Sequence, residues 1–427
     1  METNSVLGRK GFRSNGNMKI DLFSFFSGIG MLDLGFEDEG YEIALVNEFH
    51  SPFLEGYKFA RERLNYANPV FGYFGNDVID FLHGKQRQIL ERSVPEIRAK
   101  GAVVGFIGGP PCPDFSIGGN NKGRDGENGI LSQTYCDLIR QFKPDFFLLE
   151  NVKGLWKTRR HRAFYDELKR AVQSAGYLTT DRLINAIEYC VPQSRERVFL
   201  FGISADFARD LRLSFDTSSN DIPDEAFEWL RYAKYPGKAA FQFVWPRISK
   251  FQAESTLPPP DNLPLELTVE HWFQKNDVAN HPNSQHQFKA RAGLKRFLTI
   301  DEGDDSGKSF KRLHRWRYSP AAAYGHNEVH LHPYKPRRLS VSEAMAIQSL
   351  PQGFELPTSM NLTDMFQGIG NGVPYLVSRS IARSIGEFLS RSSVVHQDQH
   401  GRGISLTSEV ASTDTGDVNR SNEPVRS

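Results

Sequence analysis

Short apolar runs separated by amphipathic segments fill the first half of the chain. Between the runs, Pro52–Tyr66 and Arg160–Ala175 place apolar residues at helical spacing. The runs themselves are rich in Val, Ile, Leu and Phe and are typical of buried strands: Lys19–Phe26, Glu42–Phe49, Gly101–Gly108, Asp145–Val152 and Arg197–Ser204. Strands that alternate with helices predict an α/β fold with a doubly wound sheet.

The pattern changes near residue 206. From there to residue 330 the apolar residues follow no sustained period, and helical patterning returns at Val341–Ser349 and Pro374–Leu389. Residues 1–18 and 391–427 lack an extended apolar pattern, so we expect two disordered tails. Between the tails we expect three parts: a domain at 19–205, a smaller irregular domain at 206–330 and a segment at 331–390.

The composition is that of an ordinary soluble globular protein, with 39% apolar and 24% charged residues among 427. No apolar run approaches the roughly 18 residues of a membrane span, and residues 1–18 lack the apolar stretch of a signal peptide. Three cysteines without a C-x-x-C pair are too few for a disulfide framework. We therefore expect a cytoplasmic monomer that contacts no membrane and binds no metal.

Charge gives only a local signal. The net charge of +1 does not by itself indicate a nucleic-acid partner. Basic residues nevertheless cluster late in the irregular segment: Lys289, Arg291, Lys295, Arg296, Lys308, Lys311, Arg312, Arg315 and Arg317. Four acids at 301–305 interrupt the cluster, which is either a solvated face or a surface for phosphates.

Cys112 is the first candidate for chemistry. It lies in Gly-Gly-Pro-Pro-Cys-Pro-Asp-Phe-Ser, directly after the apolar run Gly101–Gly108. A cysteine between prolines at the end of a parallel strand occupies a rigid loop, where open α/β sheets hold their active sites. Taken alone, Cys112 is either a nucleophile that needs an environment favouring the thiolate or a small buried apolar residue.

A glycine-rich turn follows the first predicted strand. Phe26-Ser-Gly-Ile-Gly30 precedes a predicted short helix, an arrangement that lets a nucleotide-like cofactor approach the backbone. Glu48 ends the second predicted strand, where a doubly wound fold sets an acid against ribose hydroxyls. Asp77 would either meet an adenine edge or cap its own turn.

Three further charged residues lie at strand ends. Glu150, in Glu150-Asn-Val152, closes the fourth predicted strand, and a carboxylate buried there is costly unless it is hydrogen-bonded. Arg195 and Arg197 are two residues apart and lie on one side of an extended backbone. They would either pair with Glu196 or another acid, or grip an anion.

These motifs, in this order, resemble the blocks of the cytosine-5 DNA methyltransferase family of the bacterial restriction-modification type. The resemblance runs from about Lys19 to Leu389. The matching segments are Phe26-Ser-Gly-Ile-Gly30, Glu48, Asp77, Pro110-Pro-Cys-Pro-Asp-Phe-Ser116, Glu150-Asn-Val152, Gln193-Ser-Arg-Glu-Arg197, Arg337-Arg-Leu-Ser-Val-Ser-Glu343 with Gln348 and Phe354, and Gln367-Gly-Ile-Gly-Asn-Gly-Val-Pro374. One block could arise by chance, whereas so many in sequence could not.

The resemblance implies a fold, a mechanism and partners. The fold would be a Rossmann-like methyltransferase sheet with a smaller target-recognition domain. Cys112 would attack carbon 6 of a cytosine flipped out of double-stranded DNA, and carbon 5 would take a methyl group from S-adenosylmethionine. Glu150 would stabilise the base at ring nitrogen 3, while Arg195 and Arg197 would help to hold it.

The resemblance also assigns the cofactor site and the role of each domain. The cofactor would contact Phe26, Gly28, Gly30, Glu48, Phe49, Asp77, Val78, Pro111, Leu131, Asn371 and Val373. Residues 19–205 would form the catalytic domain, 206–330 would recognise the target sequence, and 331–390 would return to complete the catalytic domain. Protection of DNA from a cognate restriction endonuclease is the commonest context of such an enzyme.

Three positions depart from the family pattern. Met31 stands where many relatives have a glycine, and Cys190 replaces a common glycine, which we expect to be a packing change. Ala321–Ala323 stand where the family usually has a threonine that touches DNA, so that hydroxyl contact is missing.

Three other functions are alternatives for such a sequence. A tRNA cytosine-5 methyltransferase shares the blocks but has little chain where this sequence has 206–330. An inactive DNA-binding homologue would typically have lost Cys112 or Glu150, and a dehydrogenase has no use for Pro-Pro-Cys. The sequence therefore favours an active DNA methyltransferase.

Overall fold

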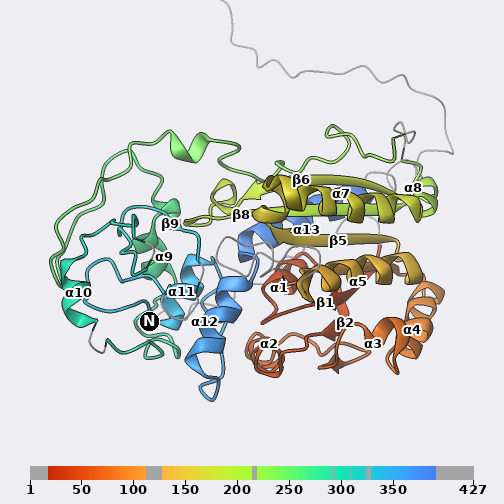
Figure 1. Ribbon diagram of the computed structural model, residues 1–427, viewed down its shortest axis with the longest axis horizontal. Coiled ribbons are helices and arrows are strands. Elements are labelled where there is room, and N and C mark those ends of the chain that lie inside the picture. The colour runs from red at the N-terminus through yellow and green to blue at the C-terminus, as the bar shows by residue number, and fades with distance from the viewer. Residues whose placement is uncertain are drawn as a thin grey trace, which may run out of the picture.

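The computed structural model describes residues 18–111, 127–213, 219–290, 293–307, 309–322, 324 and 328–390. Cys112, Arg291, Lys308 and Ala323 lie outside these residues, as do the two predicted tails apart from Met18. Figure 1 shows two parts side by side. One part is a sheet with helices packed on it, and the other is a loop-rich part that contains α9, α10 and α11.

The sheet has seven strands in the order β3-β2-β1-β4-β5-β8-β6. Strands β1 to β5 pair in parallel, whereas β8 runs antiparallel to both of its neighbours, β5 and β6. The strands are β1 Ile20–Phe25, β2 Glu42–Asn47, β3 Tyr73–Phe74, β4 Val103–Gly108, β5 Phe146–Val152, β6 Tyr177–Asn185 and β8 Glu196–Ser204. This mixed α/β architecture confirms the predicted fold class.

The five predicted strands are present, and the sequence pattern missed β3 and β6. The β3 strand has only two residues. The β6 strand contains Thr179, Thr180 and Asp181 among its apolar residues and lies at the edge of the sheet. Its polar content hid it, because a strand with only one neighbour needs no continuous apolar run.

Helices cover both faces of the sheet because successive strand residues point to opposite sides. In β1, Leu22 joins the core shared with α1, α2 and α13, whereas Phe23 and Phe25 join the core shared with α4, α5 and α7. The helices of the first face are α1 Met31–Asp38, α2 Ser51–Arg63 and α13 Tyr375–Ser390. Those of the second face are α3 Asp80–His83, α4 Arg87–Ala99, α5 Glu127–Phe142 and α7 Arg159–Ser174.

The last helix, α13, brings the end of the described chain back to its beginning. It packs closely against α1, where the Ser378 hydroxyl donates a hydrogen bond to the carbonyl of Leu32. A Cβ atom added at Gly35 would overlap Ser378, so this contact needs a glycine on α1. Residues far apart in the sequence thus share one face of the sheet.

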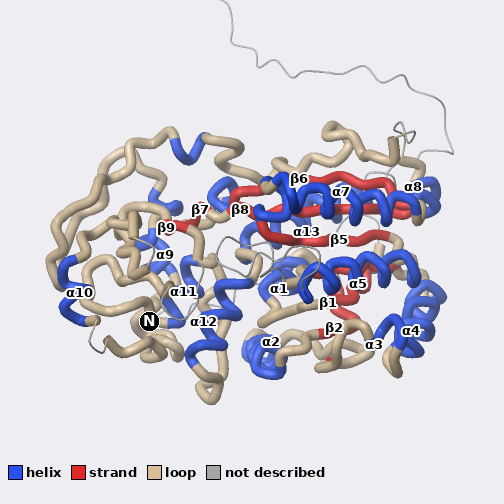
Figure 2. The backbone as a smooth tube through the Cα atoms, viewed as in Figure 1, coloured by secondary structure: helices blue, strands red, loops and turns tan. Residues whose placement is uncertain are grey.

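The loop-rich part is built on an apolar core that contains Trp272 of α9, Met345 of α11 and Phe366 of α12. Met31 and Leu34 of α1 belong to the same core. Most of this part is loop (Figure 2). Its elements are α9 Val269–Lys275, α10 Leu294–Thr299, α11 Val341–Ile347, α12 Leu362–Asn371 and the short parallel pair β7 Gln193–Ser194 with β9 Ser319–Pro320. Helix α6 (Lys153–Lys157) and α8 (Ala205–Asp210) belong to the sheet side.

The first part of the irregular segment packs on the sheet rather than in the loop-rich core. Phe227 stacks on Phe201 of β8, with ring centroids 4.8 Å apart, and also contacts Phe388 of α13. Ile222 and Trp229 lie in the same core. The chain therefore leaves the sheet core only after about residue 230.

Among the described residues, no helix is long and apolar enough to cross a membrane. Nor does this part of the chain hold a group of three His, Cys, Asp or Glu side chains that could bind a metal ion.

Candidate active site

The candidate residues gather at one edge of the sheet. The parallel strands β2, β1, β4 and β5 are consecutive neighbours, and their carboxyl ends lead into Glu48, Phe26, Gly109 and Glu150–Asn151. The chain order reverses between β1 and β4, which is the point where open α/β sheets bind their ligands. The topology therefore places the predicted cofactor turn beside the predicted catalytic loop.

The glycine turn is tied to Glu48. The Glu48 carboxylate accepts hydrogen bonds from the backbone N–H of Gly28 and of His50, each at 2.8 Å. Gly28 has φ 56° and Gly30 has φ 83°, a left-handed conformation that glycine adopts without strain. Burial raises the pKa of Glu48, and the two N–H donors oppose that rise.

A buried polar network supports this turn from below, and the sequence analysis did not find it. Arg61 of α2 donates to the Gly30 carbonyl at 3.0 Å and pairs with Glu37 at 2.7 Å. Tyr57 donates to Asp33 at 2.8 Å, and the Arg61 guanidinium lies 3.8 Å from the Tyr57 ring centroid. The spacing of Tyr57 and Arg61, one helical turn apart, was the available signal.

An exposed aromatic residue follows Glu48 directly. Phe49 is 71% exposed, which is unusual for a phenylalanine and leaves its ring open to a planar ligand. Asp77 is exposed and accepts a hydrogen bond from the Ile79 N–H at 3.0 Å, so it does cap its own turn. Val78 beside it is buried in the sheet core.

The remaining predicted cofactor residues form two groups, and Pro111 lies apart from both. Phe26 and Leu131 pack against the same apolar core, and Phe26 has φ 54°. Val373 is buried in the core of the opposite face, next to Asn371, which is exposed. Pro111 is exposed at the last described position before Cys112.

The base of the predicted catalytic loop lies directly against Glu150. A Cβ atom added at Gly109 would lie 2.8 Å from Glu150 Oε2, so only glycine fits there without displacing the carboxylate. Asn151 reaches the Pro110 carbonyl at 3.4 Å. The residues that lead into the Pro-Pro-Cys segment therefore lie next to Glu150 and Asn151. Cys112 itself is outside the described residues.

Glu150 is a buried carboxylate with a cationic neighbour. Its Oε1 atom lies 3.0 Å from Nε of Arg197, and only 7% of the residue is exposed. Burial raises the pKa of Glu150, whereas Arg197 and Arg195 lower it. A carboxyl group with a raised pKa can hold a proton and donate it in a hydrogen bond.

Arg195 contacts the backbone instead of an acid. Its guanidinium donates to the carbonyl of Ala322 at 2.8 Å and to those of Gly370, Asn371 and Gly372 at 2.6 to 3.3 Å. Among the described residues it makes no ion pair with Glu196, which pairs with Lys153 and Lys157. In this structure Arg195 therefore holds the start of β8 against the C-terminal end of α12.

A glutamine pair supports the same junction, and the sequence analysis gave neither glutamine a role of its own. Gln193 accepts from the Ala322 N–H at 3.0 Å and donates to Gln348 at 3.3 Å. Gln348 in turn donates to the Ile369 carbonyl at 2.6 Å. Both glutamines are fully buried, so these bonds satisfy amides that would otherwise be unpaired.

Two of the unusual positions have a structural reason. Cys190 has φ 63°, a left-handed conformation that favours glycine, so the exchange concerns backbone conformation and not only packing. Met31 is buried at the start of α1, where a Cβ atom added at Gly372 would overlap it. Its side chain fills space against the loop that Arg195 holds.

Neither alternative for the basic cluster, a solvated face or a phosphate surface, holds for Arg312 and Arg315, because both side chains are buried. Arg312 donates to four carbonyls, those of Phe297, Ile300, His332 and Lys335. Arg315 pairs with Glu302 at 2.9 Å, and both side chains are about 5% exposed or less. Trp272 and Trp316 are likewise buried, so neither forms part of an open reading surface.

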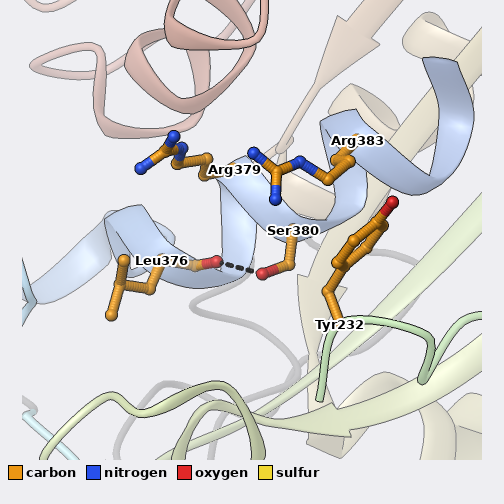
Figure 3. Close-up of a pocket in the computed structure, with 5 residues that line it drawn as sticks. All are labelled: Tyr232, Leu376, Arg379, Ser380 and Arg383. Atoms are coloured by element: carbon orange, nitrogen blue, oxygen red, sulfur yellow. Dashed lines mark hydrogen bonds between the residues drawn. The ribbon is translucent and has the colours of Figure 1, made fainter. Parts of the chain in front are cut away.

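A hollow of about 220 Å³ lies elsewhere, along α13 (Figure 3). It is lined by Tyr232, Leu376, Arg379, Ser380 and Arg383. Both arginines pair with Glu39, and the hollow shares no residue with the sites described above.

The comparisons with known proteins agree on one family. Residues 20–387 match the family described as C-5 cytosine-specific DNA methylase. The Type II methyltransferase M.NmeDI of Neisseria meningitidis serogroup C is 50% identical over 368 residues, which are 86% of this chain and 84% of that protein. The Type II methyltransferase M.FnuDI of Fusobacterium nucleatum is 28% identical over 376 residues, 86% of this chain and 95% of that protein.

Solved structures share the fold. A crystal structure of a prophage-encoded Escherichia coli protein superposes with a TM-score of 0.58 and 21% identity, covering 87% of this chain and 100% of the other. The Dnmt2 methyltransferase of S. pombe gives a TM-score of 0.53 and 12% identity, covering 86% of this chain and 99% of the other.

Proposed function

Because this chain belongs to the C-5 cytosine-specific DNA methylase family, we propose that it methylates carbon 5 of cytosine within a specific sequence of double-stranded DNA. We propose S-adenosylmethionine as the methyl donor and Cys112 as the nucleophile. The observation that carries this proposal is the arrangement at the sheet edge, where Glu150 adjoins the base of the Pro-Pro-Cys loop and Glu48 adjoins the glycine turn.

The residues near Glu48 fit such a cofactor. The carboxylate is already oriented by two N–H donors and has further lone pairs that can accept from ribose hydroxyls. The exposed ring of Phe49 offers an apolar surface for a purine, and a Cβ atom added at Gly28 would meet nothing within 4 Å, which leaves room for close approach. S-adenosylmethionine would supply an electrophilic methyl group, and the neutral thioether S-adenosylhomocysteine would be its leaving group.

The protein's own groups would then act on the base. The Cys112 thiolate forms a bond to carbon 6 of cytosine, and the electrons of the 5,6 double bond become available at carbon 5. Glu150, whose pKa is raised by burial, donates a hydrogen bond at ring nitrogen 3 and so stabilises the adduct. After carbon 5 has been methylated, a base removes the carbon 5 proton and the thiolate leaves, which restores the double bond.

Arg197 would position Glu150 within this step. The Arg197 Nε atom lies 3.0 Å from Glu150 Oε1 and would hold that oxygen in place. The other oxygen, Oε2, is the one that lies next to Gly109 at the base of the loop. The cytosine must leave the duplex to reach this edge, at a cost of a few kcal/mol. Contacts to the DNA backbone would have to offset that cost.

The relatives favour a role in restriction and modification. The Neisseria meningitidis relative at 50% identity is a Type II methyltransferase, so we propose that this chain also modifies DNA in partnership with a restriction endonuclease. The long segment at 206–330 would choose the target sequence.

The decisive experiment uses the wild type and Cys112→Ser. Bisulfite sequencing of DNA from cells that express the wild type should reveal 5-methylcytosine at one recurring sequence, whereas the serine variant should reveal none. The wild type should also form a denaturation-resistant adduct with DNA that carries 5-fluorocytosine at this site, because fluorine cannot leave as a proton. Methylation by the serine variant at the wild-type rate would contradict the covalent mechanism.

A further inference from the structure

A basic segment follows Glu150-Asn151-Val152 directly. Residues 153–162 read Lys-Gly-Leu-Trp-Lys-Thr-Arg-Arg-His-Arg, with five Lys or Arg residues and no Asp or Glu. The segment forms α6 and the first turn of α7. Neither the proposed chemistry nor the target-recognition segment uses it.

This segment is held firmly in place by its apolar and aromatic residues. Leu155 is fully buried, and the Trp156 ring packs edge-on against Tyr165 with centroids 5.2 Å apart. The Arg162 guanidinium lies 3.8 Å from the Trp156 ring centroid and pairs with Asp166 at 2.8 Å. Arg162 is therefore part of the packing, whereas Lys153, Lys157 and Arg159 are exposed.

Three cations of the segment are exposed among the side chains that the structure describes. Lys153 and Lys157 are 47% and 55% exposed, and Arg159 is exposed as well. Both lysines pair with the carboxylate of Glu196: Lys153 Nζ lies 2.8 Å from Oε2, and Lys157 Nζ lies 2.8 Å from Oε1. Since one carboxylate faces two ammonium groups, and Arg159 has no acidic partner among the described residues, the surface keeps an excess of positive charge.

This surface is connected to the proposed catalytic carboxylate. Glu196 lies next to Arg197 in β8, and Arg197 Nε lies 3.0 Å from Glu150. Lys153 is also only three residues after Glu150 in the sequence. Helix α6 begins directly after β5 ends at Val152, so Lys153 lies at the edge of the sheet where the base would react.

We propose that Lys153, Lys157 and Arg159 form a binding surface for the phosphate backbone of DNA next to the flipped-out cytosine. The inference rests on the proposed function for its choice of DNA. Ammonium and guanidinium groups on α6 and the first turn of α7 have the sign that phosphates need, and such contacts supply energy and register without reading bases. Phosphates would displace Glu196 from the two lysines.

The test measures the salt dependence of binding. Wild type and the triple variant Lys153→Gln, Lys157→Gln, Arg159→Gln are titrated with a fluorescent DNA duplex over a range of KCl concentrations. The slope of log Kd against log [KCl] should fall in magnitude by about 2 to 3, because each lost phosphate contact removes close to 0.9 of a released ion. A matched control, Lys85→Gln, Arg92→Gln, Lys100→Gln, neutralises three exposed cations near α4 and should leave the slope unchanged.

A fourth protein separates charge from folding. Glu196→Gln removes the competing carboxylate and should tighten DNA binding several-fold at low salt, in the opposite direction to the triple variant. Equal weakening by Glu196→Gln and by the triple variant, or a triple-variant slope equal to that of the control, would overturn the proposal. Loss of binding to a transfer RNA with unchanged DNA binding would overturn it in favour of an RNA surface.

The same samples distinguish this proposal from the proposed function. Transfer of labelled methyl groups to duplex DNA by the wild type tests the function, whereas the salt slope tests the surface. A wild type that methylates DNA, together with an unchanged slope in the triple variant, refutes only the surface.

Discussion

At the scale of single residues, three buried charged side chains differ in the groups that pair with them. Glu48, Glu150 and Arg195 are all nearly inaccessible, yet each has partners of a different kind: backbone N–H donors, an arginine and backbone carbonyls. A buried charge without such partners would cost several kcal/mol. The partners therefore decide whether a charged residue can still meet a ligand.

Glu48 gives the first prediction. We expect Glu48→Gln to weaken S-adenosylmethionine binding by about 1–3 kcal/mol, because a charged acceptor for the ribose is lost and the amide can accept from fewer N–H groups. Isothermal titration calorimetry measures the change. The DNA sequence that is methylated should stay the same, since Glu48 lies in the cofactor turn.

Glu62→Gln, an exposed substitution on α2, provides the control and should bind the cofactor like the wild type. Unchanged affinity in Glu48→Gln would mean that the cofactor site lies elsewhere.

At the scale of elements, long-range hydrogen bonds hold together segments with little regular structure. The Arg315 side chain fastens its loop to Glu302 and to Ser255, with hydrogen bonds of 2.6 to 2.9 Å. Arg312 does the same through four carbonyls. In a region with few helices and strands, these side chains satisfy the backbone groups that regular structure would otherwise pair.

Arg315 gives the second prediction. Arg315→Met should lower the free energy of unfolding by about 3–5 kcal/mol, because Glu302 would remain buried without its cation. Urea denaturation followed by tryptophan fluorescence measures the loss. Lys295→Gln, on exposed α10, should unfold like the wild type. A stable Arg315→Met protein with a reduced salt slope for DNA would restore the phosphate role that the structure rejects.

At the scale of the whole molecule, the loop-rich part should be sensitive to acid. Burial lowers the pKa of His314 to about 4 and the pKa values of His330 and His332 to about 3. In the unfolded chain these histidines titrate near 6.5, so below that pH the unfolded state binds more protons than the folded state. Stability is therefore complete above about pH 6.5 and is lost as the pH falls toward 4.

This is the third prediction, and its size follows from proton linkage. Each buried neutral histidine should make the free energy of unfolding of the protein about 2 kcal/mol lower at pH 5 than at pH 7. The free energy of unfolding, measured between pH 7 and pH 5, gives the slope. His330→Gln should reduce that slope by roughly one third of the histidine contribution, and an identical slope in the variant would show that His330 is not buried and neutral.

The fourth prediction concerns the division of labour between the two parts. Exchange of residues 234–330 for the corresponding segment of a relative with known specificity should transfer the relative's target sequence. Exchange of 206–330 should instead destabilise the chimaera, because Phe227 and Trp229 would be removed from contact with the sheet core. Bisulfite sequencing reads the target, and thermal unfolding reads the stability. A folded, active 234–330 chimaera that kept the original target would place recognition elsewhere.

The sequence alone determined the five main strands and the placement of the candidate chemistry at their ends. Apolar runs such as Val103–Gly108 are local signals, since a strand buried on both faces must be apolar throughout. The glycine turn and each of the other blocks are also short local motifs, and their order along the chain was sufficient to indicate the family.

Only the tertiary structure decided how the buried charges are used. Arg195 donates to the carbonyls of Ala322 and Gly370, which are distant from it in the chain. Arg312 donates to the carbonyls of Phe297 and His332, which lie in different segments of the loop-rich part. No periodic pattern marks such contacts, because they depend on which loops the fold brings together. The antiparallel direction of β8 is of the same kind: an apolar run predicts a strand, but its neighbours and direction follow from the path of the whole chain.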